Sequence, residues 1–156
     1  MKLDIKKLLI SLGIPLAVGG LSALVSGGFG ERYQNLKQPP FAPPGWLFPI
    51  VWSILYLLMG YAAYRVWVSP AEKTKKIPAW GFYIAQLLLN FLWSPIFFRL
   101  EMRLTAFFIM LALWVAIALT LRFFSQIDEF AGDLLLPYLL WVTFAAYLNL
   151  GVFFLN

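Results

Sequence analysis

The sequence predicts an all-α membrane protein that forms a single bundle of five transmembrane helices. Of its 156 residues, 62% are hydrophobic and only 12% are charged, and the mean hydropathy is +0.82. Soluble domains carry about 25% charged residues, whereas five membrane-spanning helices need about 100 residues of mostly apolar sequence, close to what this chain provides. No apolar run alternates polar and apolar residues, which argues against a transmembrane β-barrel.

Five apolar runs define the expected helices, and each is long enough to cross about 30 Å of hydrocarbon. They cover residues 5–26, 46–68, 79–98, 103–124 and 133–155, and they make one domain over residues 1–156. The first run follows three lysines and so resembles a secretory signal peptide. It is longer than a signal-peptide core and ends in a poor cleavage sequence, so we expect a retained helix.

The connection between the first two helices, residues 27–45, is the longest and contains four prolines and four glycines. Each proline fixes one backbone φ angle, so the segment is expected to be stiff. A long, stiff loop is typical of a lid or a binding element. A plain surface connection is an equally good interpretation of the same residues.

The basic residues predict the orientation in the membrane. One side of the bundle is expected to carry Lys2, Lys6, Lys7, Arg65, Lys73, Lys75, Lys76 and Arg122. The other side carries only Arg32, Lys37, Arg99 and Arg103. The positive-inside rule then places the N-terminus in the cytoplasm and the loop 27–45 outside, with a reversed or dual topology left open.

Several functions are disfavoured by residue content. The chain has no His and no Cys, and no acidic residue lies deep within an apolar run. Proton pumps, ion-coupled carriers and charged pores need such groups within the membrane, and a metal site lacks its commonest ligands. The scattered basic residues form no stripe of the kind that binds nucleic acid.

Uncharged polar and aromatic residues share faces on three of the expected helices. Gln86, Asn90 and Trp93 lie on one face of the third helix, as expected for spacings of four and three residues. The second and fifth helices carry further faces of this kind, which comprise Trp52, Tyr56, Met59 and Ala63 and then Tyr138, Trp141, Ala145 and Asn149. These faces predict an aromatic cavity for a flat, largely apolar ligand. Interhelical hydrogen bonding by the amides, without any ligand, is the alternative and the commoner fate of a membrane Asn.

Three motifs, in this order, resemble the translocator protein family, which is also called the peripheral benzodiazepine receptor or tryptophan-rich sensory protein family (TspO/MBR). They are PPGWLFPIVWSILYLLMG at 43–60, QLLLNFLWSPIFF at 86–98 and PYLLWVTFAAYLN at 137–149. The resemblance covers nearly the whole chain. It departs from the family pattern in the loop, where Arg32 precedes Tyr33, Gln38 replaces a Lys and Phe41 replaces a Trp.

The resemblance implies a five-helix bundle that binds tetrapyrroles, sterol-like lipids and benzodiazepine-type drugs beneath the first loop. The pocket residues that it implies are Trp52, Asn90, Trp93, Tyr138, Trp141 and Ala145. It also implies a homodimer through the third helix, at Gly81 and Ala85. The pattern for cholesterol recognition lacks its basic residue after Tyr147, which argues against tight cholesterol binding there.

The leading hypothesis is therefore a membrane receptor or carrier for a porphyrin, in contact with membrane lipid and needing no cofactor. Arg32, Tyr33 and Lys37 are expected at the pocket mouth, where a cation can pair with porphyrin propionates. The alternatives are porphyrin degradation that depends on light and oxygen and uses pocket Trp residues, or a regulatory membrane protein without transport. Short termini without a targeting extension favour a bacterial cell membrane.

Overall fold

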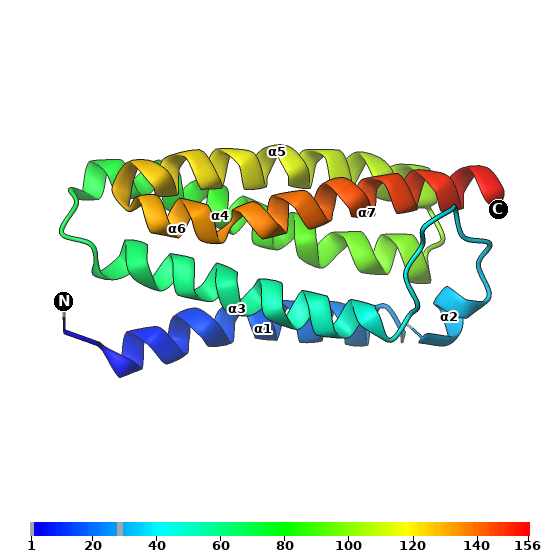
Figure 1. Cartoon of the computed structure of the whole chain (residues 1–156), viewed down its shortest axis with the longest axis horizontal. Coiled ribbons are helices and arrows are strands. Elements are labelled where there is room, and N and C mark those ends of the chain that lie inside the picture. Colours follow the sequence, from blue (N-terminus) through cyan, green and yellow to red (C-terminus); the bar gives the residue numbers. More distant parts are fainter. Residues whose placement is uncertain (1, 28–29) are drawn as a thin grey trace.

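The computed structural model describes residues 2–27 and 30–156, which form an elongated bundle of antiparallel helices (Figure 1). Five spans are long and apolar enough to cross a membrane, namely Ile5–Val25, Leu47–Val68, Lys73–Arg99, Arg103–Ile127 and Glu129–Leu155. The described residues contain helices and no strands. The predicted fold class, an all-α bundle of five transmembrane helices, is confirmed.

Three of the five spans are single helices and two are interrupted. The helices are α1 (Ile5–Val25), the short loop helix α2 (Gly30–Gln34), α3 (Leu47–Val68), α4 (Lys73–Ser94), α5 (Arg103–Ile127), α6 (Glu129–Leu134) and α7 (Leu136–Leu155), with a π-helical turn η1 (Pro95–Arg99) after α4. Helices α6 and α7 together make the fifth span. The loop expected over 27–45 thus contains one helical turn of its own.

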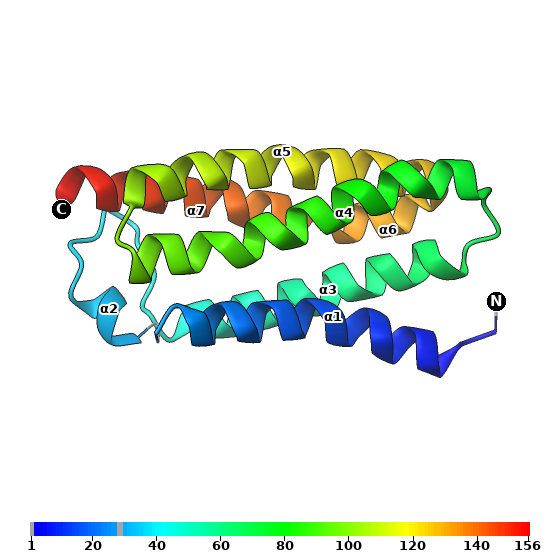
Figure 2. The same cartoon turned by 180° about the vertical axis from the view of Figure 1, so that it is seen from behind.

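The spans close into a ring in which α1 packs on α3 and α4, and α5 packs on α4, α6 and α7. Helix α3 meets the fifth span mainly through α6, near the end of the bundle that holds the N-terminus. The loop with α2 lies at the opposite end, beside the C-terminus (Figure 2). The loop end of the bundle is therefore where α3 and α7 separate and leave space between them.

Helices α1 and α3 approach each other closely because of a glycine and a proline. A Cβ atom at Gly60 would lie 2.5 Å from the backbone oxygen of Ser11. Pro15 has no N–H to bond that oxygen, which stands four residues earlier in α1. The close contact with Gly60 therefore occurs where the helix has an unused carbonyl group.

A second proline ends α4 and begins η1. Pro95 has no N–H, so the backbone oxygen of Phe91 loses its helical partner. The hydroxyl of Ser22 in α1 donates to this oxygen at 2.8 Å. The third span therefore changes from α to π geometry where α1 supplies the missing hydrogen bond, and its last residue is Arg99 instead of the predicted Phe98.

Two predicted helix starts are wrong. The third span begins at Lys73, not at residue 79, and Pro78 lies inside α4. Pro78 stands in the second turn, where it lacks the N–H that would bond the Thr74 carbonyl, and the helix continues through it. The fifth span begins at Glu129, not at residue 133, because the carboxylate of Asp128 caps α6 by accepting from the backbone N–H of Ala131 at 3.2 Å.

Candidate ligand-binding site

Two adjoining cavities lie in the loop half of the bundle. The larger, which we call the α1 cavity, has a volume of about 290 Å³. Its walls come from α1, α3, α4 and α5. They include Leu16, Gly19, Gly20, Ser22, Ser53, Tyr56, Asn90, Ser94 and Met110. The smaller, which we call the lid cavity, has a volume of about 40 Å³ and is lined by Tyr33, Leu36, Gln38, Phe97, Phe98, Trp141, Ala145, Leu148, Asn149 and Val152.

Three aromatic side chains, Phe48, Trp52 and Trp93, line both cavities and form the wall between them. The indole N–H of Trp93 donates to the side-chain oxygen of Asn149 at 2.8 Å, which fixes this ring. The Trp52 ring stacks on Tyr56, with ring centroids 5.6 Å apart, and its indole N–H has no hydrogen-bond partner among the described residues. Trp52 is therefore the less constrained of the two indoles in the wall.

Four of the six predicted pocket residues surround the lid cavity: Trp52, Trp93, Trp141 and Ala145. Trp141 lies opposite the wall and meets Phe48 edge-on, with ring centroids 5.7 Å apart. The structure thus brings indole rings from α3, α4 and α7 together around one small space. All three side chains are half-buried.

Asn90 and Tyr138, the other two predicted pocket residues, take part in a chain of hydrogen bonds between helices. The hydroxyl of Tyr56 donates to Asn90 Oδ1 at 2.8 Å, and Asn90 Nδ2 donates to the hydroxyl oxygen of Tyr138 at 2.6 Å. Tyr138 in turn donates to Gln86 Oε1 at 2.8 Å. Asn90 also lines the α1 cavity, whereas Tyr138 is 1% exposed and lies behind the cavity walls. Both amides thus have the interhelical role that the sequence left open.

The loop covers the lid cavity and is fixed at several points. The Arg32 guanidinium donates to the backbone oxygen of Phe98 at 2.6 Å, and the hydroxyl of Tyr33 donates to the backbone oxygen of Pro43. Tyr33 packs on Phe48 with centroids 5.0 Å apart, and burial raises its pKa. At the far edge, the backbone of Lys37 exchanges two hydrogen bonds with the Asn156 side chain, at 3.2 and 3.0 Å. We call this loop the lid.

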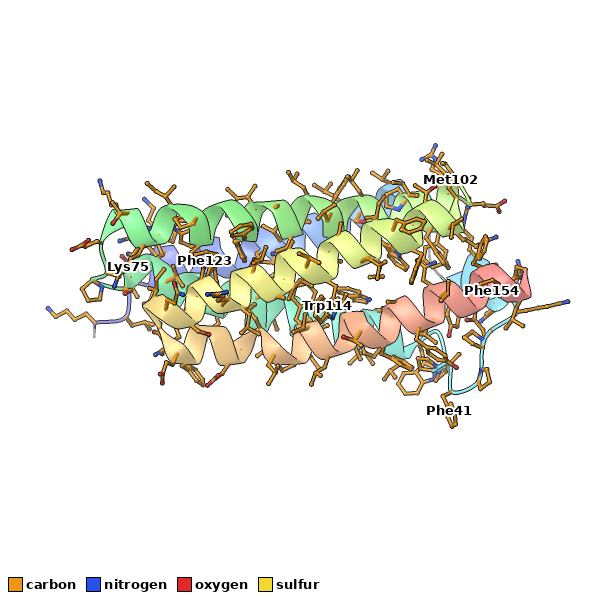
Figure 3. The ribbon with its side chains drawn as sticks, turned by 90° about the horizontal axis from the view of Figure 1, so that it is seen from above. Phe41, Lys75, Met102, Trp114, Phe123 and Phe154 are labelled. Atoms are coloured by element: carbon orange, nitrogen blue, oxygen red, sulfur yellow. The ribbon has the colours of Figure 1, made fainter. Side chains whose placement is uncertain are left out.

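The predicted mouth residues therefore have different positions. Tyr33 lines the lid cavity, whereas Arg32 and Lys37 are exposed at the edge of the lid. Phe41 projects from the lid away from the helices and is 90% exposed (Figure 3). Its φ of +69° is uncommon for a bulky residue.

Several wall residues were not expected from the sequence. Gln38 and Phe48 line the lid cavity, and the Gly19–Gly20 pair of α1 lines the other. A Cβ atom at Gly19 would lie 2.2 Å from the Tyr56 ring, whereas one at Gly20 would meet nothing within 4 Å. Adjacent glycines in a membrane helix are a signal of close approach that points to α1 as a cavity wall.

The predicted dimer contact lies on the outside of the bundle. Gly81 is exposed and a Cβ atom there would meet nothing within 4 Å, and Ala85 is half-buried one turn later. Exposed apolar side chains of α4 flank them: Ile77, Ile84, Leu88 and Leu92. This face is available to lipid or to a second copy of the chain. Within residues 2–27 and 30–156, no cluster of acidic side chains is placed to hold a metal ion.

A family model described as the TspO/MBR family matches residues 11–155. The chain belongs to the TspO/MBR family. The resemblance drawn from the three motifs is confirmed. With the five apolar spans, membership establishes an integral membrane protein with a sensory or translocator role.

Named relatives agree with this assignment. The tryptophan-rich sensory protein of Cereibacter sphaeroides is 42% identical over 126 residues, covering 81% of this chain and 77% of the relative. The tryptophan-rich protein TspO of Chlorobaculum tepidum is 36% identical over 157 positions, covering 100% and 99%. The translocator protein of Homo sapiens is 38% identical over 129 residues, covering 82% and 76%.

Proposed function

We propose that this chain is a membrane receptor or carrier that binds tetrapyrroles, with sterol-like lipids and benzodiazepine-type drugs as further ligands. The observation that carries the proposal is the convergence of Trp52, Trp93 and Trp141 from three spans around adjoining cavities. Flat apolar rings gain favourable stacking against indoles, and the few polar groups of such a pocket orient the ligand.

Binding of a tetrapyrrole needs the two cavities to join. Drug-sized ligands occupy pockets of about 300–1,000 Å³, and the α1 cavity alone, at about 290 Å³, is at the lower limit. Rotation of Trp52, which no hydrogen bond holds, would connect it with the lid cavity. Arg32 and Lys37 at the edge of the lid then supply cations for the propionates of the ligand.

The ligand is bound through its ring and its edge, and no cofactor is required. The sequence has no His or Cys to ligate haem iron, so haem and metal-free protoporphyrin are expected to bind with comparable affinity. A strong preference for haem, with the absorption spectrum of an axially ligated iron, would contradict this part of the proposal.

Titration with protoporphyrin tests the function. Tryptophan fluorescence of the purified protein should be quenched with saturation at about one ligand per chain. Trp141→Ala should weaken binding at least tenfold, because it removes a ring that stacks against the ligand. Trp114→Phe is the matched control, since Trp114 lies on α5 away from both cavities and donates to Thr143. Linear, unsaturable quenching would instead indicate partitioning into detergent.

Porphyrin degradation under light and oxygen is the second candidate. It is favoured by the position of Trp52 in the wall of both cavities, because an indole beside an excited porphyrin can donate an electron, which molecular oxygen then takes from the reduced porphyrin. Under illumination, porphyrin absorbance should then fall in the wild type. It should stay constant in Trp52→Phe, with binding retained, if the indole of Trp52 takes part.

We also propose the arrangement of the protein in its membrane. The excess of basic residues at the N-terminal end supports a cytoplasmic N-terminus, and a bacterial cell membrane is the proposed location. The exposed small-residue face at Gly81 and Ala85 supports a homodimer through α4. Cross-linking of single cysteines at these positions in membranes tests the dimer.

A further inference from the structure

Lysine side chains from two helices meet at Trp67, at the end of the bundle that holds the N-terminus. The Lys7 ammonium of α1 lies over the Trp67 ring of α3, with Nζ 5.4 Å from the ring centroid. The Lys76 ammonium of α4 donates to the backbone oxygens of Trp67 and Ser69 at 3.1 and 2.6 Å. Three spans therefore contribute one residue each to a cluster of Lys7, Trp67 and Lys76, which we call the Trp67 cluster.

The end of α3 holds Lys76 in place. The helical partner of the Trp67 oxygen would be the backbone N–H of Ala71, which donates instead to the Ser69 hydroxyl at 3.2 Å. Lys76 supplies the missing donor and is half-buried in this position. An ammonium group has three N–H donors, so one donor of Lys76 remains after its two bonds to α3.

The positive charge of the Trp67 cluster is poorly compensated. Lys7 pairs with Asp4 at 4.0 Å, but the two side chains are 41% and 43% exposed, and such pairs contribute little energy. Lys76 forms no ion pair with an acidic side chain in the part of the chain that the structure describes. It is also close enough to Lys7 for the two ammonium groups to repel each other. An anion bound between the two groups would relieve this repulsion.

The Trp67 cluster lies at the depth of the lipid headgroups. The first and third spans begin at Ile5 and Lys73, and the second ends at Val68, so all three reach the edge of the hydrocarbon here. Trp67 is 37% exposed, and partly exposed indoles are typical of this interface. The anion that a bilayer offers at this depth is the phosphodiester of a lipid headgroup.

We infer that the Trp67 cluster binds the phosphodiester of an acidic phospholipid whose headgroup carries no cation, such as phosphatidylglycerol. Lys7 and the remaining donor of Lys76 bond to the phosphate oxygens, as basic pockets between spans do with acidic headgroups. A choline or ethanolamine headgroup would bring its own cation close to both ammonium groups, which repel it. The cluster and the lid lie at opposite ends of the bundle, so the inference does not depend on the proposed function (Figure 2).

Native mass spectrometry of the full chain in detergent tests the site, with phosphatidylglycerol and phosphatidylcholine of identical acyl chains as probes. We expect the wild type to prefer phosphatidylglycerol by about tenfold or more, since each lysine beside an acidic headgroup contributes about fivefold. Lys7→Gln should weaken the binding of phosphatidylglycerol about fivefold. Its matched control is Lys6→Gln, which removes the same charge from the neighbouring exposed residue and should leave the affinity unchanged.

Lys76→Gln and Lys75→Gln form the second matched pair. Lys76→Gln should weaken binding about fivefold or more, whereas Lys75→Gln removes an exposed charge of the same helix and should not. Because Lys76→Gln also removes two bonds to α3, thermal denaturation without added lipid measures that structural loss separately. The Lys7 ammonium makes no hydrogen bond to a described residue, so Lys7→Gln tests the site even if Lys76→Gln does not fold.

Three results would overturn the assignment. Equal affinity of the wild type for the two lipids would mean that the cluster does not select an acidic headgroup. Equal losses in Lys7→Gln and Lys6→Gln would mean that the lipid responds to the charge of the whole surface. Glycerol 3-phosphate is the soluble probe, and at millimolar concentration it should leave bound phosphatidylglycerol in place. Displacement of the lipid would mean that the site takes a free phosphate ester instead.

Discussion

The two halves of α3 have the same apolar character but produce opposite kinds of interior. In the half near Arg65, Ala62, Ala63 and Val66 are at most 3% exposed, and they pack in one cluster with rings of neighbouring helices such as Tyr83 and Phe124. In the half near the lid, Phe48 and Trp52 stand opposite glycines and serines of α1, and the cavities remain. Where large rings of α3 face small residues of α1, the side chains leave gaps. Where small residues of α3 pack among rings of neighbouring helices, the side chains leave no such gap.

The half of α3 near Arg65, which we call the closed half, is also held by an ion pair. Arg65 and Asp128 form a two-pronged ion pair with N–O distances of 3.0 and 3.3 Å, and their side chains are only 28% and 14% exposed. The Arg65 guanidinium packs on Phe130, 4.8 Å from the ring centroid. This pairing joins α3 to the start of α6, so the two spans that separate at the lid are held together at the other end.

The largest expected effect comes from adding volume where α1 and α3 touch. Gly60→Val places a side chain against the Ser11 carbonyl and the Leu12 backbone, 2.5 and 2.7 Å from the new Cβ. Backbone cannot rotate away, so we expect a loss of about 3 kcal/mol or more in stability, at the upper end for overpacking. Thermal denaturation in detergent measures it. Gly13→Val, where the added atom meets nothing within 4 Å, is the control, and equal losses in both variants would refute the contact.

Asn90 lies between the closed half and the cavities. Its substitution therefore distinguishes a role in helix packing from a role in ligand binding. Asn90→Ala leaves the hydroxyls of Tyr56 and Tyr138 without their amide partner. We expect a loss of about 1–2 kcal/mol in stability without ligand, since interhelical hydrogen bonds in membranes contribute about 0.6 kcal/mol each and unpaired buried groups add to the cost.

The control for Asn90 is Ser53→Ala, because Ser53 lines the same cavity but donates only to Pro49 of its own helix. Stability should change little in this variant. If Asn90→Ala instead left stability unchanged and removed protoporphyrin binding, Asn90 would be a ligand contact, and the hydrogen-bond chain would not hold the helices together.

Filling the α1 cavity should weaken binding without loss of fold. A side chain at Gly20 points into open space beside the cavity, so Gly20→Leu occupies volume that the proposed ligand needs. We expect an increase of about tenfold in the protoporphyrin Kd, the scale set by one buried apolar group. Gly13→Leu is matched in propensity and in open space but lies outside the cavity. A similar Kd for both variants would place the ligand elsewhere.

The contrast between the halves explains what the sequence could and could not predict. Span positions and the faces of Trp52, Trp93 and Trp141 depend on run length and helical spacing, which are local properties. The roles of Gln38 and Gly20 depend on what remains unfilled between helices, because a cavity is a difference between packed volumes. Helical spacing predicts the correct face for Asn90. Whether its amide binds a ligand or two tyrosines depends on residues 34 and 48 positions away, which local spacing does not reveal.

The smallest expected effect concerns the lid rather than the helices. Asn156→Ala removes both hydrogen bonds between the C-terminal side chain and the backbone of Lys37. These bonds are exposed and so contribute little to stability, but they hold the edge of the lid closed. We expect entry and release of protoporphyrin to become about two- to fivefold faster, with the Kd nearly constant, because opening is eased in both directions. Stopped-flow fluorescence resolves the two rates, and Asn35→Ala, elsewhere on the same loop, should leave them unchanged. A faster release alone, with a correspondingly weaker Kd, would mean that Asn156 acts on the bound ligand. Unchanged rates would mean that access runs past the α1 side of the bundle.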